Sequence, residues 1–269
     1  MDAMGSEPTM QVPSEVIVAA LRDAWREPGA GQPLYGSGPP LRPIAESEED
    51  QLIPSGGSSP LWEIVRWMPA EPDGQALSPT SLSEAFARPL AFRLDVLGAS
   101  RHALATRFTW SIISPGDVAW VVAQLEGRAV VEIGAGTGYW AWQLQQAGVD
   151  VAAYDPHSPG EDNRYCTAGP YTTVLVEDAS AVKRHPDRAL LMVWPPLGGE
   201  HARHALSVYE GDLLLYAGEG LGGCTADDAF YKMLNAEWEL TSVAPRHVTW
   251  SGIHCELAAY RRKRGEHRG

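Results

Sequence analysis

From Ser114 onward, short apolar segments alternate with segments of helical periodicity, and this alternation limits the fold more than any other feature. Five strands are expected, at residues 129–133, 149–155, 172–178, 189–194 and 212–218. Four helices are expected among them, at 140–147, 200–209 and 226–238, and before the first strand, where Ser114, Pro115 and Gly127 bracket a helix. Strands that are apolar throughout and separated by helices indicate a parallel sheet covered on both faces.

The last two apolar segments, 238–247 and 254–262, follow each other without a helix between them. Strands that are joined by so short a connection pair antiparallel, because a parallel pair needs a long crossover. Residues 114–262 are therefore expected to form a doubly wound α/β domain. Its sheet is predicted to have seven mostly parallel strands and to end in an antiparallel terminal hairpin.

The first part of the chain, residues 1–113, has a different composition. Pro and Gly recur throughout it, and helical spacing is confined to segments such as 14–25 and 81–97. We expect a helical, loop-rich N-terminal region, part of which packs on the sheet domain through Trp62, Trp67 and Trp110. At the other end of the chain, residues 263–269 are expected to be a solvated basic tail.

The bulk composition excludes several classes of function. The formal net charge is −13, which argues against sequence-independent binding to the phosphate backbone of a nucleic acid. Cys166, Cys224 and Cys255 are widely spaced and odd in number, which predicts reduced thiols, and the histidines show no metal-ligand spacing, so no metal is expected. Neither a secretory leader pattern nor an apolar run of membrane-spanning length is visible, and we expect a cytoplasmic protein with no membrane partner.

A glycine loop follows the first predicted strand, in the stretch EIGAGTGYW. Its glycines follow the pattern G-x-G-x-G, with Gly134, Gly136 and Gly138, whereas a dinucleotide fingerprint would place its third glycine at position 139, which is Tyr139. Glycines between a strand and a helix let a ligand approach the main chain closely. The next two strands end in acids, Asp155 and Asp178, which are expected at the same edge of the sheet.

The stretches EIGAGTGYW, AAYDP and VEDAS resemble the first three cofactor motifs of the class I S-adenosylmethionine-dependent methyltransferases. The resemblance covers about half the chain, from Trp110 to Tyr260, and implies S-adenosyl-L-methionine as cofactor. It implies contacts to the methionine and ribose from Gly134, Ala135 and Gly136, with Glu132 supporting the loop or the amino-acid end. It further implies that Asp155 holds the ribose hydroxyls and that Asp178, with the main chain at Ala179, holds the adenine.

Weaker signals concern the methyl acceptor. VWPPL, at 193–197, resembles a motif of methyltransferases that act on planar nitrogens, but Trp194 replaces the Asn or Asp that would accept the amino hydrogens. Trp194 either stacks on a planar acceptor or on adenine, or packs in the core. Trp110 either folds over the cofactor and substrate or anchors the core. Glu219, in a glycine-rich loop after the fifth strand, and His254 are candidate catalytic bases.

Together these features predict a methyltransferase acting on a small molecule or a peptide, with natural-product biosynthesis as one setting. The N-terminal region is expected to supply a lid or part of the acceptor pocket. Two alternatives stay open. One is a non-catalytic protein that binds S-adenosylmethionine for regulation. The other is an NAD-dependent oxidoreductase, which the glycine spacing disfavours.

Overall fold

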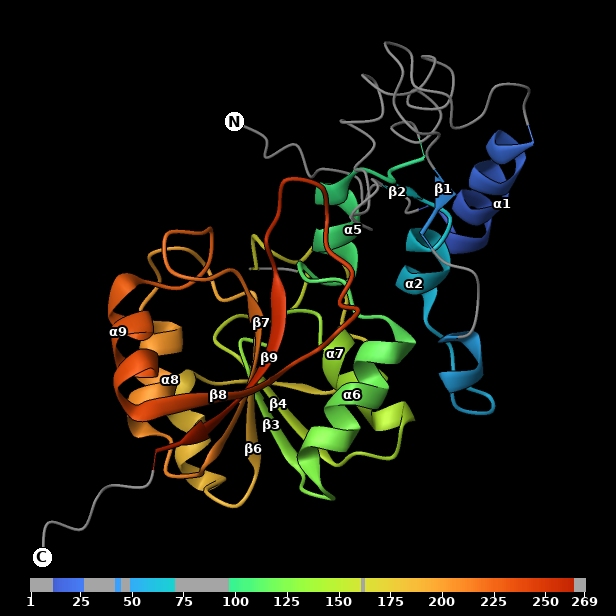
Figure 1. Cartoon of the computed structure of the whole chain (residues 1–269). Helices are drawn as coiled ribbons and strands as arrows, with labels where there is room; N and C mark the ends of the chain where they lie inside the picture. The colour runs from blue at the N-terminus through green and yellow to red at the C-terminus, as the bar shows by residue number, and fades with distance from the viewer. Residues whose placement is uncertain (1–11, 27–41, 45–48, 71–96, 161–162, 264–269) are drawn as a thin grey trace, which may run out of the picture.

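A computed structural model describes residues 12–26, 42–44, 49–70, 97–160 and 163–263 of the chain (Figure 1). Its main feature is a seven-stranded sheet in the order β5-β4-β3-β6-β7-β9-β8. The strands are β3 (Val130–Ile133), β4 (Val151–Asp155), β5 (Val174–Val176), β6 (Ala189–Val193), β7 (Leu213–Gly218), β8 (Trp238–Val243) and β9 (Glu256–Arg262). The first five are parallel, while β9 runs antiparallel to both β7 and β8. The predicted doubly wound fold with its terminal hairpin is confirmed.

The strand order reverses at β3. The chain runs from β3 outward through β4 to β5, and then crosses back to place β6 on the other side of β3. In open α/β sheets such a reversal opens a crevice at the carboxyl ends of the two strands that flank it, and ligands bind there. The loops that follow β3 and β6 therefore start at the position where this fold forms its sites.

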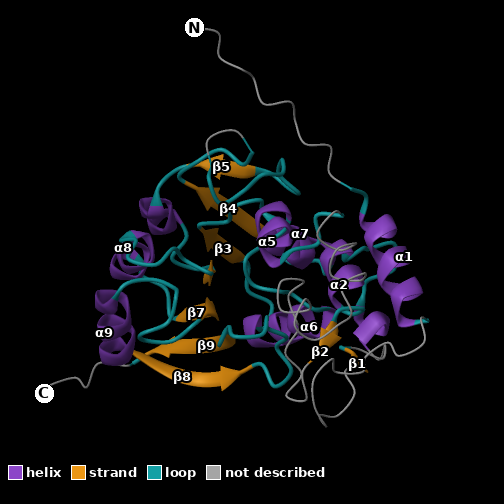
Figure 2. Cartoon of the chain, turned by 90° about the horizontal axis from the view of Figure 1, so that it is seen from above, coloured by secondary structure: helices purple, strands orange, loops and turns teal. Residues whose placement is uncertain are grey.

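Helices cover both faces of the sheet (Figures 1 and 2). On one face lie the 3₁₀ helix η2 (Ala179–Arg184), α8 (His201–Val208) and α9 (Asp228–Glu237). The other face carries α6 (Pro115–Leu125) and α7 (Tyr139–Gln146), with α1 (Ser14–Trp25), α2 (Pro60–Val65) and α5 (Arg101–Arg107) on the same side. The first part of the chain also contains a short 3₁₀ helix, η1 (Glu49–Leu52), and an antiparallel pair, β1 (Arg42–Pro43) and β2 (Pro69–Ala70).

The start of α6 shows how the local sequence fixes an element. The Ser114 hydroxyl accepts from the N–H of Asp117 at 3.0 Å, and the Asp117 carboxylate accepts from the N–H of Ser114 at 2.9 Å. This reciprocal capping satisfies two of the main-chain donors that a helix start leaves unpaired. Pro115 occupies the first turn, where its missing N–H costs nothing. The predicted bracket of this helix is confirmed.

Two hydrophobic cores sandwich the sheet, because successive side chains of a strand point to opposite faces. In β6, Leu191 belongs to the core beneath α6 and α7, while Leu190 and Met192 belong to the core beneath α8 and α9. Both cores are therefore built from the same uniformly apolar strands that the sequence pattern indicated.

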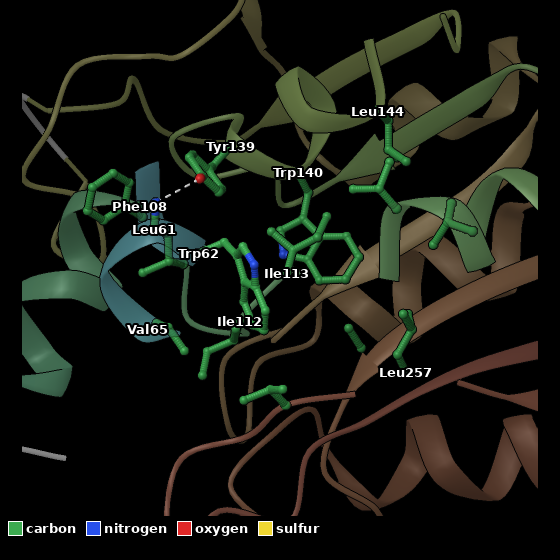
Figure 3. Close-up of a cluster of buried hydrophobic side chains, with 14 of the residues drawn as sticks. Leu61, Trp62, Val65, Phe108, Ile112, Ile113, Tyr139, Trp140, Leu144 and Leu257 are labelled. Carbon is green, nitrogen blue, oxygen red and sulfur yellow. Dashed lines mark hydrogen bonds between the residues drawn. The ribbon is translucent and has the colours of Figure 1, made fainter. Parts of the chain in front are cut away.

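The N-terminal region shares the core of the sheet domain (Figure 3). Trp62 on α2 is 1% exposed and lies in one cluster with Trp140 of α7. The N–H of Leu61 donates to the Tyr139 hydroxyl at 3.1 Å. The buried core is thus continuous across the predicted boundary at residue 113.

Two other predictions fall mostly outside the described residues. The predicted helix at 81–97 lies there except for Leu97, and so does the basic tail except for Lys263. Among the residues that are described, no helix combines the length and the apolar character needed to cross a bilayer.

Candidate functional site

A cavity of about 850 Å³ opens at the carboxyl ends of β3, β4 and β6. It is within the size range of small-molecule sites, roughly 300–1,000 Å³. One wall comes from the loops that follow these three strands and from the start of η2, and another comes from residues 101–110, which precede the sheet. The predicted residues that line it are Trp110, Glu132, Gly134, Ala135, Gly136, Asp155, Ala179 and Trp194.

The glycine loop lies against this cavity through Gly134 and Gly136, which adopt φ angles of +77° and +55°. A Cβ atom added to Gly134 would meet no atom within 4 Å, so its bare side faces open space. Gly138 has a different role. It caps α7 with a φ of +70°, does not line the cavity, and leaves room for Val174, whose Cγ2 would lie 2.8 Å from an added Cβ.

The main-chain donors of the loop are already used within the protein. The N–H groups of Gly134 and Ala135 both donate to the carbonyl oxygen of Tyr154, at 2.8 and 2.9 Å. The N–H of Gly136 donates to Asp155 Oδ2 at 2.9 Å. A phosphate cradle needs such N–H groups free and directed at the ligand. A ligand can therefore come close to the main chain at these three residues, but their N–H groups are not free to bind an anion.

Asp155 is the organising acid of the site. Besides the bond from Gly136, its carboxylate accepts from the N–H of His157 at 3.0 Å and from Asn163 Nδ2 at 3.1 Å. Burial raises the pKa of Asp155, and the main-chain hydrogen bonds from His157 and Gly136 oppose that rise without cancelling it. A carboxylate offers about four acceptor positions, so about one remains for a ligand hydroxyl.

Asn163 was missed by the sequence analysis. It lies in the connection between β4 and β5, which shows no periodicity and carries no recognisable motif. Its side chain is buried, lines the cavity and contacts Asp155, and the N–H of Tyr165 donates to its Oδ1 at 3.0 Å. Only the folded chain brings it to the acid that ends β4.

Glu132 is buried at 1% exposure beneath the loop. Its Oε2 accepts from the N–H of Ala141 at 3.1 Å, which ties β3 to the first turns of α7. Burial, with a smaller contribution from Asp155, raises the pKa of Glu132 to about 8, against the hydrogen bond from Ala141. With this pKa the side chain is mainly a neutral acid at neutral pH. Its support of the loop or of the cofactor's amino-acid end stays a prediction.

The acid predicted to hold adenine lies at the edge of the site. Ala179 is buried and lines the cavity, but Asp178 is exposed and does not. The Asp178 carboxylate accepts from the N–H of Ser180 at 2.8 Å and so begins η2. Its adenine contact stays a prediction.

Trp194 and Trp110 both line the cavity. Trp194 directly follows β6 with a φ of +48°, and its N–H donates to the carbonyl of Ala217 at 2.7 Å. A bulky residue in the left-handed region stores strain, which is found most often at functional sites. Trp110 is fixed by its indole N–H, which donates to the carbonyl of Tyr165 at 3.0 Å.

Glu219 and His254 are in contact, but the contact is made by the main-chain N–H of His254 and not by its imidazole ring. The N–H of His254 donates to Glu219 Oε1 at 2.8 Å, and the N–H of Cys224 donates to Oε2. Burial works to raise the pKa of Glu219, and these hydrogen bonds outweigh it and hold the pKa below its usual value. Neither residue lines the cavity, so the structure gives Glu219 a loop-anchoring role, and catalysis by this pair stays a prediction.

Arg101 is a second residue that the sequence analysis missed. It begins α5, directly after Ser100, whose hydroxyl accepts from the N–H of Ala103 and caps the helix. Its side chain lines the cavity beside Trp110 and Trp194. Arg101 belongs to no recognisable sequence motif, so no signal in the sequence could have placed it at the cavity.

Comparisons with known proteins give likenesses in structure alone. No protein-family model matches the chain, and no curated protein matches it. One similar solved structure is magnesium protoporphyrin IX methyltransferase from Synechocystis PCC 6803 with bound S-adenosylmethionine, at 15% identity and a TM-score of 0.36, covering 54% of this chain and 76% of that one. A structure concerning conversion of a disulfide bond into a thioacetal group during echinomycin biosynthesis has 18% identity and a TM-score of 0.35, covering 54% and 80%. A putative RNA methyltransferase from Pyrococcus horikoshii has 16% identity and a TM-score of 0.34, covering 56% and 85%.

Proposed function

We propose that this chain is an S-adenosylmethionine-dependent methyltransferase acting on a small molecule or a peptide. The observation that carries the proposal is the cavity at the strand-order reversal, lined by the bare side of Gly134 and by the acid that ends the next strand, Asp155. Because the N–H groups of Gly134, Ala135 and Gly136 are already bonded within the protein, this lining suits a close-packed neutral or cationic ligand better than a pyrophosphate.

The residues present fit an adenosyl cofactor. Gly134 offers a space that a Cβ would fill, Asp155 keeps an acceptor position for a ribose hydroxyl, and buried Ala179 lines the adjoining wall. When bound, S-adenosylmethionine supplies a methyl group that its sulfonium already activates.

The protein's own task is then to position the acceptor and to exclude water. Pro195 and Pro196 line the cavity directly after Trp194, and their fixed φ angles make this wall rigid. A rigid wall serves an in-line displacement, whose rate depends on the alignment of the reacting atoms. A side-chain base is needed only for an acceptor that must lose a proton.

Calorimetry with S-adenosylhomocysteine tests the proposal. We expect binding in the micromolar range, weakened about tenfold or more by Asp155→Ala, because a hydrogen bond to a charged group contributes about 1.5–3 kcal/mol. Asp150→Ala is the matched control, because Asp150 is exposed and pairs with Arg188 away from the cavity. NADH binding in place of S-adenosylhomocysteine would overturn the proposal. Cofactor binding without methyl transfer to any of a broad acceptor panel would support the regulatory alternative.

A further inference from the structure

The side chain of Arg101 lies close to two tryptophans of the cavity wall. Its guanidinium carbon is 5.7 Å from the centre of the Trp194 ring and 5.9 Å from that of Trp110. Both distances are within the range of about 6 Å over which a cation is attracted to an aromatic face. The two rings belong to segments far apart in sequence, one before the sheet and one at the end of β6.

Among the residues that the structure describes, the side chain of Arg101 has no hydrogen-bond partner. Its Nε is buried and has no hydrogen-bond partner, and no ion pair or hydrogen bond of the guanidinium occurs within the described part of the chain. Glu219 is the main source of opposite charge acting on Arg101, but both of its carboxylate oxygens accept main-chain N–H groups. Burial lowers the pKa of Arg101, and Glu219 only partly offsets this.

A half-buried cation with free donors is costly unless a ligand satisfies it. The guanidinium is flat, and its fork of N–H groups matches the two oxygens of a carboxylate. With aromatic rings beside it, the remaining opening favours a flat ligand that can also contact Trp110 and Trp194. We propose that Arg101 is the anchor of the acceptor subsite and binds the carboxylate of a planar aromatic acceptor.

This inference rests on the proposed function, because it assigns the methyl acceptor of the same site. The cofactor's methionine also carries a carboxylate, so the same chemistry has two sources. The surroundings of Arg101 favour the acceptor. Glu219, the main source of opposite charge acting on it, follows β7, and Cys224 in the same loop lines the cavity. β7 lies two positions from β3, where the glycine loop begins.

The test compares 2-naphthoate with 2-naphthamide, which has a similar shape and no charge. Their affinities are measured by calorimetry, with and without saturating S-adenosylhomocysteine. The wild-type protein should bind the carboxylate about tenfold more tightly than the amide or better, because the carboxylate can form charge-assisted bonds. Arg101→Gln should remove this preference, while Arg101→Lys, which keeps the charge without the fork, should keep part of it.

Arg26→Gln is the matched control, since it removes the same charge from an exposed pair with Asp23 on α1. It should leave the preference intact. Equal affinities for the two probes in the wild-type protein would overturn the proposal without reference to any variant. So would a preference that survives in Arg101→Gln.

Measuring the affinity for S-adenosylhomocysteine distinguishes the carboxylate of the acceptor from that of the cofactor. Arg101→Gln should leave the affinity for S-adenosylhomocysteine unchanged, and a loss of tenfold or more would assign Arg101 to the cofactor and overturn the acceptor subsite. If the wild-type protein binds no S-adenosylhomocysteine at all, the proposed function fails. The probe preference measured without it still decides whether Arg101 is a carboxylate site.

Discussion

The Nδ1 atom of His247 lies 3.1 Å from Oδ2 of Asp117, and both side chains are almost fully buried. On the other side of the ring, Nε2 lies 3.4 Å from the Ser111 hydroxyl. The order serine, histidine, aspartate matches that of a hydrolytic triad. The charge state does not, because Asp117 outweighs the effect of burial and raises the pKa of His247 to about 10. A protonated ring cannot take the serine proton, and none of the three lines the large cavity. The cluster pins the loop after β8 to the start of α6.

This ion pair predicts a loss of stability at high pH. An unfolded histidine titrates near 6.5, and the folded His247 near 10, so the pair's contribution is fully present below about pH 6.5 and is lost as pH rises through 10. At pH 6, His247→Gln should cost about 3–5 kcal/mol, because it leaves Asp117 buried without its partner. Urea denaturation from pH 6 to 10.5 should show the gap between wild type and variant narrowing. A gap that stays constant would show that His247 is neutral in the folded protein.

Glu132 also predicts a loss of stability with rising pH, but over a lower pH range than His247. Its pKa is raised to about 8 in the folded protein, so between about pH 4.5 and 8 the unfolded chain releases a proton that the folded chain retains. Stability should therefore fall as pH rises across this window. Glu132→Gln keeps an acceptor for the Ala141 N–H and removes the ionisation, so it should gain on wild type from pH 5 to pH 8 in urea denaturation. Glu126→Gln, at an exposed site, should show no such trend.

Alanine variants of two glycines with similar backbone angles distinguish an effect on cofactor binding from an effect on stability. Gly134 and Gly148 have φ angles of +77° and +82°, and an added Cβ would meet no atom within 4 Å at either. Alanine at each position should cost about 1–2 kcal/mol, the strain of a left-handed residue. Only Gly134→Ala should also weaken S-adenosylhomocysteine binding, because only Gly134 lines the cavity. Calorimetry on both variants checks this. Equal affinities in the two would place the cofactor elsewhere.

The burial of Trp62 predicts that the N-terminal region unfolds together with the sheet domain in a single thermal transition. Because its ring lies in the core shared by α2 and α7, Trp62→Ala should cost about 3–5 kcal/mol. The thermal transition should shift as a whole and remain single, since the two regions share one core. Val16→Ala on the exposed side of α1 should stay within about 0.5 kcal/mol of wild type. A separate low-temperature transition in calorimetry would show that the N-terminal region unfolds on its own.

Most of what could be predicted from the sequence came from the regular spacing of apolar residues. Uniformly apolar segments such as 189–194 predicted the parallel strands, and the glycine loop with Asp155 predicted where the cavity lies. Residues that reach the site from irregular segments escaped prediction, because their position depends on contacts distant in sequence. Asn163 reaches Asp155 from a connection without periodicity, and Arg101 reaches Trp194 across the fold.

Glu219 shows a different limit. Its place after β7 could be predicted, but the direction of its carboxylate could not. That direction is set by the N–H of His254, which lies 35 positions further along the chain. A carboxylate that is committed to main-chain donors looks the same in a sequence as one that is free to act on a ligand.

The walls of the cavity come from two separate stretches of chain. Gly134 and Asp155 lie at the ends of neighbouring strands, whereas residues 101–110 reach the cavity from outside the sheet, and Leu104 and Phe108 among them are buried in the core. Under the proposed function, redesign of the acceptor is therefore confined to the positions of this segment that face the cavity, such as Arg101 and Trp110. A library randomised at those positions would sample new acceptors and leave the wall proposed to bind the cofactor unchanged.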